Sequence, residues 1–117
     1  MLIAKKYNLK VIEDNAQSPG ALCNGVYTGT IGDIGVFSLN YHKHIHTGEG
    51  GMCVTNNAEL SERMQLIRNH AEAVVEDKGE NSLVNMIGFN FRMGEIEAAI
   101  GVEQLKKLPY LINEKVE

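Results

Sequence analysis

Residues Phe37 to Gly51 read FSLNYHKHIHTGEGG and place one lysine, Lys43, between a short apolar strand and a glycine-rich turn. Glycines allow a tight backbone there, so the Lys43 side chain is expected to be held partly out of water. Desolvation favours the neutral form of an amine, which is the nucleophilic form. The upstream run Val11 to Asp14 is expected to be a buried strand that ends in two carboxylates. Ligands of open α/β sheets gather at the carboxyl ends of strands, so Asp14 and Lys43 are predicted to face one crevice.

Short apolar runs rich in Val, Ile and Phe predict strands at residues 10–13, 34–39 and 52–55. Such runs are typical of strands that are covered on both faces. Gly29 to Gly32 is predicted to be a turn, because it lacks the Lys-Ser/Thr ending of a phosphate loop and opens no helix. The polar stretch from Ala71 to Met86 is predicted to be a loop.

Helices are expected to alternate with these strands. Leu2 to Tyr7 is typical of the tail of a helix, and a second helix is predicted to start at Asn56 as N-cap, with Glu59 three residues on. A last helix, from about Met93, carries a broad apolar surface that needs cover on two sides, and a second subunit is expected to supply one of them. Pro109 is expected to end or kink that helix. The alternation favours an α/β layer.

Composition excludes several classes of protein. The chain has 117 residues and a net charge of -4, without a Lys/Arg cluster that could follow phosphodiesters, so nucleic acid is not an expected partner. No apolar run approaches the roughly 18 residues of a membrane span, and no signal-peptide pattern opens the chain, so a cytoplasmic location is expected. Cys23 and Cys53 are expected to be reduced structural thiols.

Three blocks of sequence resemble a known family. They are VIEDNAQSPGA (Val11 to Ala21), GDIGVFSLNYHKHIHTGEGGMCVTNN (Gly32 to Asn57) and GFNFRMGEIEAAIGVEQLKKL (Gly88 to Leu108). In order and spacing they are similar to the DegT/DnrJ/EryC1/StrS family, whose members are pyridoxal-phosphate (PLP) aminotransferases acting on keto-sugar nucleotides.

The resemblance implies the fold class. It predicts an α/β fold that is part of the large PLP-binding domain of an aspartate-aminotransferase-like (fold type I) enzyme, with a mixed, mostly parallel sheet and flanking helices. Residues 1–117 are expected to form a single partial domain, the second half of the large domain plus the helices that follow. The N-terminal part and the C-terminal small domain are expected to be absent, since both ends of the chain look cut.

The resemblance also implies roles for site residues. Lys43 matches the lysine that carries PLP and serves as acid and base, and Asp14 matches the carboxylate that pairs with the pyridine nitrogen. Gln17 matches the residue against the cofactor ring and its phenolic oxygen, and Ser38 matches a phosphate-binding hydroxyl. Asn90 matches a residue that reaches the phosphate of the neighbouring subunit, which implies a homodimer.

Each role has a simpler alternative. A lysine after an apolar strand is often solvated, and Asp14 at a strand end is often a turn or helix cap. Ser38 and Asn90 are residue types that readily bond to nearby backbone. Glu13 would point to the side of an extended strand opposite Asp14, so only one of the pair can serve. The role of Arg92 is left open.

Three alternating histidines suggest a further alternative. His42, His44 and His46 would share a face of an extended segment, as metal ligands could, although no second ligand cluster accompanies them. The resemblance instead favours a position near the sugar.

The predicted reaction is amino transfer from an amino acid, glutamate or glutamine, to a nucleotide-linked keto-sugar in amino-sugar or polysaccharide biosynthesis. A PLP-dependent keto-sugar dehydratase is the alternative within the family, in which a histidine replaces the lysine. A third possibility is a truncated, non-catalytic fragment, because the segment by itself lacks other parts of the site and is expected to be inactive alone.

Overall fold

The computed structural model describes residues 1–71 and 87–116, which fall into two compact units. One unit comprises Met1–Asn56 and Gly94–Glu117, and the other comprises Asn57–Met93. Apart from Ala71, the loop predicted up to Met86 lies outside the described residues. The first unit contains the sheet, so it positions most of the predicted site.

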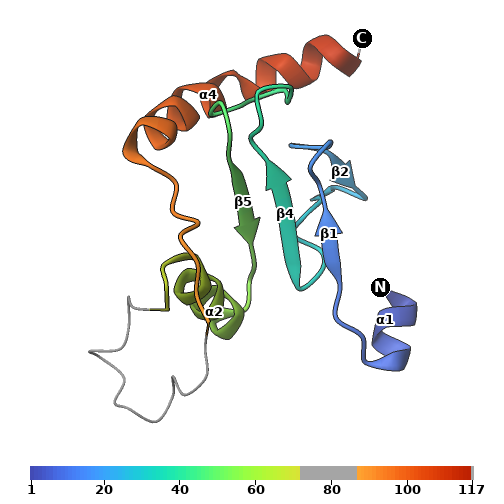
Figure 1. The fold of residues 1–117 in the computed structure, drawn as a ribbon. Coiled ribbons are helices and arrows are strands. Elements are labelled where there is room, and N and C mark those ends of the chain that lie inside the picture. The colour runs from blue at the N-terminus through green and yellow to red at the C-terminus, as the bar shows by residue number, and fades with distance from the viewer. Residues whose placement is uncertain (72–86, 117) are drawn as a thin grey trace. The chain divides into compact units, whose positions relative to one another are not determined.

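The sheet of the first unit has three strands in the order β1-β4-β5 (Figure 1). β1 spans Ile12–Asp14, β4 spans Ile34–Ser38 and β5 spans Gly51–Val54. β1 and β4 run parallel, and β5 runs antiparallel to β4. The predicted α/β class with a mixed sheet is therefore confirmed, and each strand lies within two residues of its predicted bounds.

Close backbone approach fixes the start of β4 against β1. Gly35 is buried, and a Cβ there would collide with the backbone of Gly29, so only glycine fits. The Asp33 carboxylate accepts hydrogen bonds from Val11 N at 2.8 Å and from Lys10 Nζ at 3.0 Å. The Val11 N–H, followed by the Lys10 ammonium, holds the pKa of Asp33 below its ordinary value.

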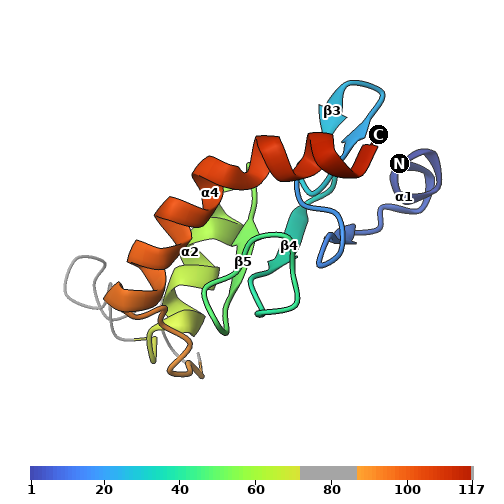
Figure 2. The same ribbon diagram turned by 90° about the horizontal axis from the view of Figure 1, so that it is seen from above.

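A small hairpin separates β1 from β4. β2 (Leu22–Cys23) and β3 (Val26–Tyr27) are antiparallel, and both turn residues, Asn24 and Gly25, have positive φ (Figure 2). Asn and Gly are the residue types that such a turn favours. Cys23 and Cys53 are both free and both exposed.

Two helices belong to the first unit. α1 spans Leu2–Tyr7, and α4 spans Glu95–Val116. Of the two predicted effects of Pro109, an end of the last helix is wrong, because α4 continues past it, and a kink stays a prediction. Proline has no N–H, so the carbonyl of Leu105, four residues earlier, loses its hydrogen-bond donor. Leu105 and Pro109 are both exposed, so water can donate to that carbonyl instead.

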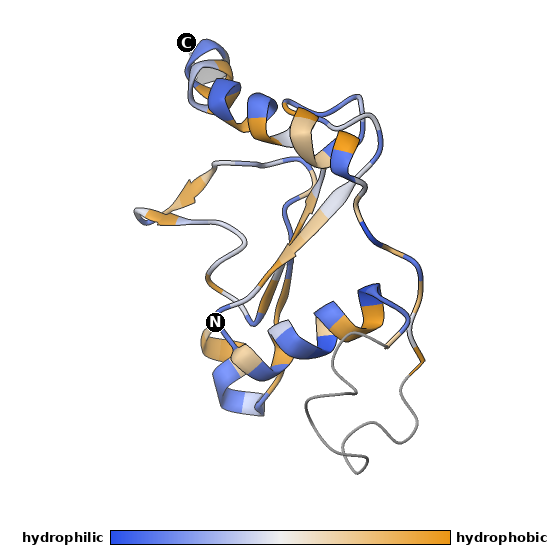
Figure 3. Ribbon diagram, turned by 90° about the vertical axis from the view of Figure 1, so that its left-hand side faces the viewer, coloured by the Kyte–Doolittle hydropathy of each residue, from blue (hydrophilic) through white to orange (hydrophobic). Residues whose placement is uncertain are grey.

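The apolar core of the described residues is small. Among the residues of the first unit whose side chains the structure describes, only Leu39 and Ile45 are buried apolar residues, at 7% and 4% exposure. By contrast Ile12 of β1 and Ile96 of α4 are 67% and 75% exposed, and Figure 3 shows apolar residues both along the strands and on the helices. The strands and the last helix were predicted to be covered on two sides. The described residues do not supply that cover.

The second unit contains α2 (Ala58–Arg68). The N-cap is Asn57 rather than the predicted Asn56, because the Asn57 side chain accepts a hydrogen bond from Leu60 N at 3.0 Å. Leu66 is the buried apolar residue of this helix. No helix of residues 1–71 and 87–116 is long and apolar enough to cross a bilayer.

Candidate functional site

The carboxyl ends of β1 and β4 bring two predicted site residues onto one face of the sheet. Asp14 pairs with Val36 across the parallel ladder, and Ser38 follows Val36 by two residues. Side chains alternate along strands and match across them, so Asp14 and Ser38 share a face. Glu13 pairs with Gly35 and therefore lies on the opposite face, as the sequence predicts.

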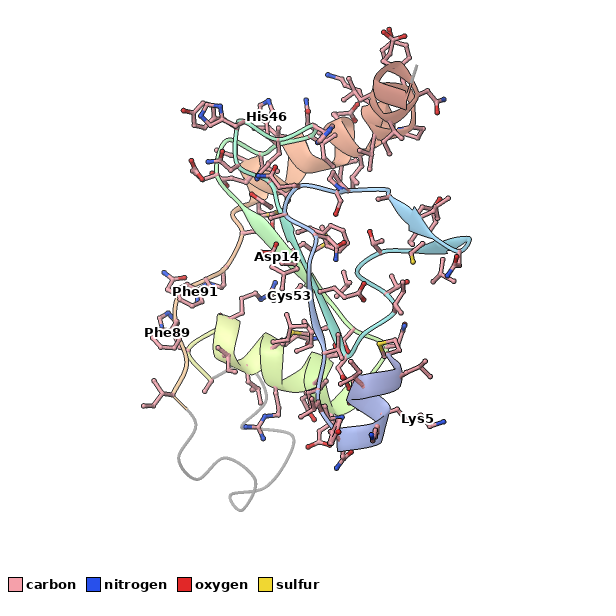
Figure 4. All side chains as sticks on the ribbon, turned by 90° about the vertical axis from the view of Figure 1, so that its right-hand side faces the viewer. Lys5, Asp14, His46, Cys53, Phe89 and Phe91 are labelled. Carbon is pink, nitrogen blue, oxygen red and sulfur yellow. The ribbon has the colours of Figure 1, made fainter. Side chains whose placement is uncertain are left out.

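The segment after β1 turns sharply at Asp14. The Asp14 Oδ1 atom accepts a hydrogen bond from Ala16 N at 3.0 Å, which is the local cap considered as its simpler role. Its other carboxylate oxygen has no hydrogen-bond donor among the described residues, and the side chain is exposed (Figure 4). Gln17 follows in the same turn and is also exposed. Asp14 therefore keeps an acceptor for a ligand while its backbone is held locally.

Glu13 has a role that sequence reasoning did not assign. Its carboxylate accepts N–H groups from Gly29 at 2.8 Å, Ile31 at 2.8 Å and Gly32 at 2.6 Å. The Gly32 N–H, followed by that of Gly29, lowers the pKa of the Glu13 carboxyl, although partial burial opposes this. The predicted turn is thus confirmed, and Glu13 ties it to β1.

Lys43 lies in the loop that follows β4. Of the lysines whose side chains the structure describes, it is the only one that is not exposed. No described residue accepts a hydrogen bond from the Lys43 Nζ atom or forms an ion pair with it. By contrast, Lys10 forms an ion pair with Asp33, and Lys106 forms one with Glu103. Lys43 therefore combines partial burial with an amine that is not committed to a partner.

The loop is closed by hydrogen bonds at its base. Leu39 N donates to Gly50 O at 2.8 Å, and Thr47 N donates to Leu39 O at 3.0 Å. Thr47 is buried, and its methyl group lies against Gly101 of α4, where an added Cβ would stand 3.2 Å away. α4 thus supports the loop that carries Lys43 at the edge where β1 and β4 end (Figure 1).

The three histidines do not form a metal site. Residues 41–49 are turns and bends rather than an extended strand, so alternation does not place the imidazoles on one face. Among the described residues no group of three His, Cys, Asp or Glu side chains could hold a metal ion. His42 is exposed and its ring lies against that of Tyr41, with centroids 3.8 Å apart and planes tilted by 36°, while His44 and His46 are half-buried.

Asn90 belongs to the second unit. It forms an isolated antiparallel bridge with Asn69 and is exposed. Arg92 Nη1 donates to Asn69 Oδ1 at 2.7 Å, which gives Arg92 a local structural contact. Phe89 and Phe91 stack beside Asn90, with ring centroids 5.0 Å apart (Figure 4). Within the first unit the structure therefore brings Asp14, Ser38 and Lys43 to one edge of the sheet, whereas Asn90 belongs to the second unit.

Sequence reasoning also missed Asn40. It lies two residues after Ser38 and three before Lys43, and it contacts both through hydrogen bonds. Its side chain binds Glu49 across the loop. The only signal in the sequence is an amide residue directly after an apolar strand, which is too common to indicate a role.

A lysine and a carboxylate are the residue types that hold the aldehyde and the pyridine nitrogen in PLP sites, and the first unit has both at one edge of its sheet. Residues 1–117 match the model of the DegT/DnrJ/EryC1/StrS aminotransferase family over their whole length. The chain belongs to this family, and the resemblance stated from its sequence blocks is confirmed.

Two curated relatives are a sugar-nucleotide synthase and a sugar-nucleotide transaminase. The chain is 41% identical over 106 residues to a GDP-perosamine synthase from Caulobacter vibrioides, a match that covers 91% of this chain and 28% of the relative. It is 47% identical over 100 residues to a dTDP-3-amino-3,6-dideoxy-alpha-D-galactopyranose transaminase from Aneurinibacillus thermoaerophilus, covering 85% and 26%. The chain therefore spans less than a third of the length of these relatives.

Solved structures of similar fold include both kinds of enzyme considered above. Helicobacter pylori PseC, described as an aminotransferase involved in the biosynthesis of pseudoaminic acid, matches with a TM-score of 0.81 and 38% identity, over 93% of this chain and 29% of its own. An E. coli GDP-4-keto-6-deoxy-D-mannose-3-dehydratase with bound hydrated PLP matches with a TM-score of 0.76 and 36% identity, over 92% and 31%. These matches confirm the predicted fold class, part of the domain found in PLP-dependent aminotransferases.

Proposed function

We propose that the protein carrying these residues is a PLP-dependent aminotransferase. It would move an amino group from an amino acid, glutamate or glutamine, to a nucleotide-linked keto-sugar. The family supports the class of reaction, and the transaminase and synthase relatives support a nucleotide-linked sugar as substrate. We place the reaction in the cytoplasm, with neither nucleic acid nor membrane as a partner.

The observation that carries this proposal is the partial burial of Lys43 together with its lack of a hydrogen-bond or ion-pair partner among the described residues. Lys43 is a half-buried lysine at the carboxyl edge of a parallel strand pair, and no residue that the structure describes pairs with its amine, so this amine is available to react. Lysine side chains usually seek water or an opposite charge, so this exception favours a chemical role over a structural one.

The chemistry of the donor set supports PLP as cofactor. The four polar groups that this cofactor needs are an amine, a carboxylate, a hydrogen-bond partner for the phenolic oxygen and a phosphate donor. Lys43, Asp14, Gln17 and Ser38 supply these groups in one unit. When bound, PLP supplies an aldehyde and a pyridine ring that accepts electrons.

Each residue then has a defined task. Lys43 Nζ would hold the aldehyde group of PLP and would act as the base for the α-proton of the amino donor. The carboxylate of Asp14 would keep the pyridine nitrogen protonated, because a nearby opposite charge favours the charged form. Ser38 Oγ accepts the Asn40 N–H at 3.3 Å, so its own proton remains available to a phosphate oxygen.

Two further assignments complete the proposed site. The Gln17 amide donates to the phenolic oxygen without bringing a competing charge. Asn90 of a second copy contacts the phosphate, so that the active enzyme is a homodimer. The exposed apolar residues of α4, among them Ile96 and Val102, support an interface on that helix.

A dehydratase is the second candidate, because a solved dehydratase has a similar fold. In such enzymes of the family a histidine stands in place of the cofactor-bearing lysine. His42 and His44 flank Lys43, but neither replaces it. Lys43 therefore favours amino transfer.

The two candidates are separated by product analysis. The protein that carries these residues, rather than residues 1–117 alone, is incubated with PLP, glutamate and a nucleotide-linked 4-keto-6-deoxy sugar, and products are identified by mass spectrometry. We expect an amino sugar from the wild-type protein, none from Lys43→Ala, and an unchanged yield from Lys5→Ala, which alters an exposed lysine (Figure 4). A dehydrated sugar as the main product would favour the dehydratase, and no reaction would favour a non-catalytic chain.

A further inference from the structure

Asn40 is the hydrogen-bonding centre of the loop that carries Lys43. Its backbone N donates to Ser38 Oγ at 3.3 Å, and its backbone O accepts from Lys43 N at 2.9 Å. One residue therefore contacts the proposed phosphate-binding hydroxyl on one side and the proposed cofactor-bearing lysine on the other.

The side chain of Asn40 spans the loop. Its Nδ2 atom donates to both carboxylate oxygens of Glu49, at 2.7 Å and 2.9 Å. Its Oδ1 atom accepts from His42 N at 3.1 Å. Hydrogen bonds to an ionised acceptor are shorter and stronger than neutral ones. All the polar groups of Asn40 are therefore engaged, and all of them within the segment from Ser38 to Glu49.

The Glu49 side of the loop is held independently of Asn40. Thr47 N donates to Leu39 O at 3.0 Å, Thr47 Oγ1 donates to Glu49 O at 2.9 Å, and Leu39 N donates to Gly50 O at 2.8 Å. Thr47 is 3% exposed. Glu49 is thus a fixed point to which the Asn40 side chain attaches the segment that bears Lys43.

We infer that Asn40 and Glu49 form a clasp that positions Lys43 and Ser38 for the cofactor. This inference rests on the proposed function, because the clasp acts on residues assigned to PLP. Neither Asn40 nor Glu49 is assigned a contact with substrate or cofactor, so both are positioning residues. Loss of the hydrogen bonds between Asn40 and Glu49 frees the backbone around Lys43. It also changes the orientation of the Ser38 hydroxyl, which accepts the Asn40 N–H.

An exchange of the two side-chain types tests the clasp. Asn40→Asp alone places two carboxylates against each other, so the segment should separate from Glu49. Adding Glu49→Gln to that variant restores one amide and one carboxylate with their positions exchanged, and it also restores the net charge. Asn113→Asp is the matched control, because it adds the same charge at an exposed position of α4.

The first readout is the rate at which added PLP becomes attached to Lys43, trapped with borohydride and quantified by peptide mass spectrometry. The second is hydrogen exchange of the amides of residues 40–50, which does not depend on PLP. We expect Asn40→Asp to slow attachment roughly tenfold and to speed exchange, in line with loss of a charge-assisted hydrogen bond. The exchanged double variant should recover to within about threefold of wild type, and Asn113→Asp should match wild type.

Two results would overturn the clasp. One is attachment and exchange in Asn40→Asp at wild-type rates, and the other is a double variant no better than Asn40→Asp. If the wild-type protein itself attaches no PLP at Lys43, the proposed function fails and the inference fails with it. Attachment in the wild type with no effect of Asn40→Asp overturns the clasp alone.

Discussion

Asp14 and Ser38 end two neighbouring parallel strands and lie on the same face of the sheet, because Asp14 pairs with the residue two positions before Ser38. This register places the carboxylate and the hydroxyl together while Glu13 turns to the other face. One face of the sheet therefore serves the proposed site, and on the other face Glu13 binds the turn at Gly29 to Gly32.

Asp14→Asn should remove the charge that holds the pyridine proton. The amide keeps the shape and can still accept the Ala16 N–H, so folding should be little affected. We expect kcat for amino transfer to fall roughly 100-fold or more, the size seen when a single electrostatic contact to a reacting group is lost. Steady-state kinetics measure this, with Glu114→Gln as a control at an exposed carboxylate. An unchanged kcat would show that Asp14 is only a turn cap.

Glu13→Gln should weaken the attachment of the turn at Gly29 to Gly32. A carboxylate accepts all three N–H groups, whereas an amide presents a donor to at least one of them. We expect a loss of roughly 1–3 kcal/mol in the free energy of unfolding at neutral pH. Urea denaturation followed by circular dichroism measures it, and a loss below the error of the method would contradict the role of Glu13.

The same carboxylate makes stability depend on pH. Because the pKa of Glu13 is lowered in the folded state, its contribution is present above the ordinary value of 4.5 and is lost as the pH falls through the folded-state pKa. Glu13→Gln should therefore flatten part of the loss of stability that occurs as the pH falls below 4.5. An identical acid profile in wild type and variant would argue against this linkage.

Gly35→Ala should be poorly tolerated. The added Cβ would meet the backbone of Gly29, which cannot rotate away as a side chain can. We expect destabilisation at or above the roughly 1–3 kcal/mol typical of overpacking. Gly25→Ala is the comparison: it has open space and a φ of +79°, so it should lose only roughly 1–2 kcal/mol. Thermal unfolding midpoints that rank the two variants in the reverse order would contradict this packing.

Residues 1–117 expressed alone should associate and show no activity. Large apolar side chains such as Ile12 and Ile96 are exposed, and few apolar residues are buried. Size-exclusion chromatography should show aggregates or oligomers. A clean monomer with one cooperative unfolding transition would contradict this expectation.

The order of elements could be predicted from local patterns. Apolar runs placed β1, β4 and β5 within two residues, because strand-forming residues stand between clear turn signals. The predicted N-cap of α2 was one residue too early. Asn56 and Asn57 are the same residue type, so only the backbone conformation, which the sequence does not show, makes Asn57 the N-cap. Pro109 was predicted to end or kink the last helix, and it does not end α4, because the helix continues for seven residues beyond it despite one missing hydrogen bond.

The site could be predicted only in part. Family resemblance placed Asp14 and Lys43, and strand register then showed which face Asp14 occupies. The Asn40–Glu49 contact joins residues nine positions apart, and it forms only because β4 and β5 pair and return the chain. The turn that binds Glu13 depends likewise on the pairing of β1 with β4. Neither contact has a sequence signal of its own.

Identification of the lysine that holds the cofactor tests the account most directly. The protein is incubated with PLP, reduced with borohydride and digested, and the modified lysine is located by mass spectrometry. The account predicts stoichiometric modification of Lys43, its loss in Lys43→Ala, and only trace modification of exposed lysines such as Lys5 and Lys107. Modification spread evenly over the exposed lysines, with Lys43 unmodified, would contradict it.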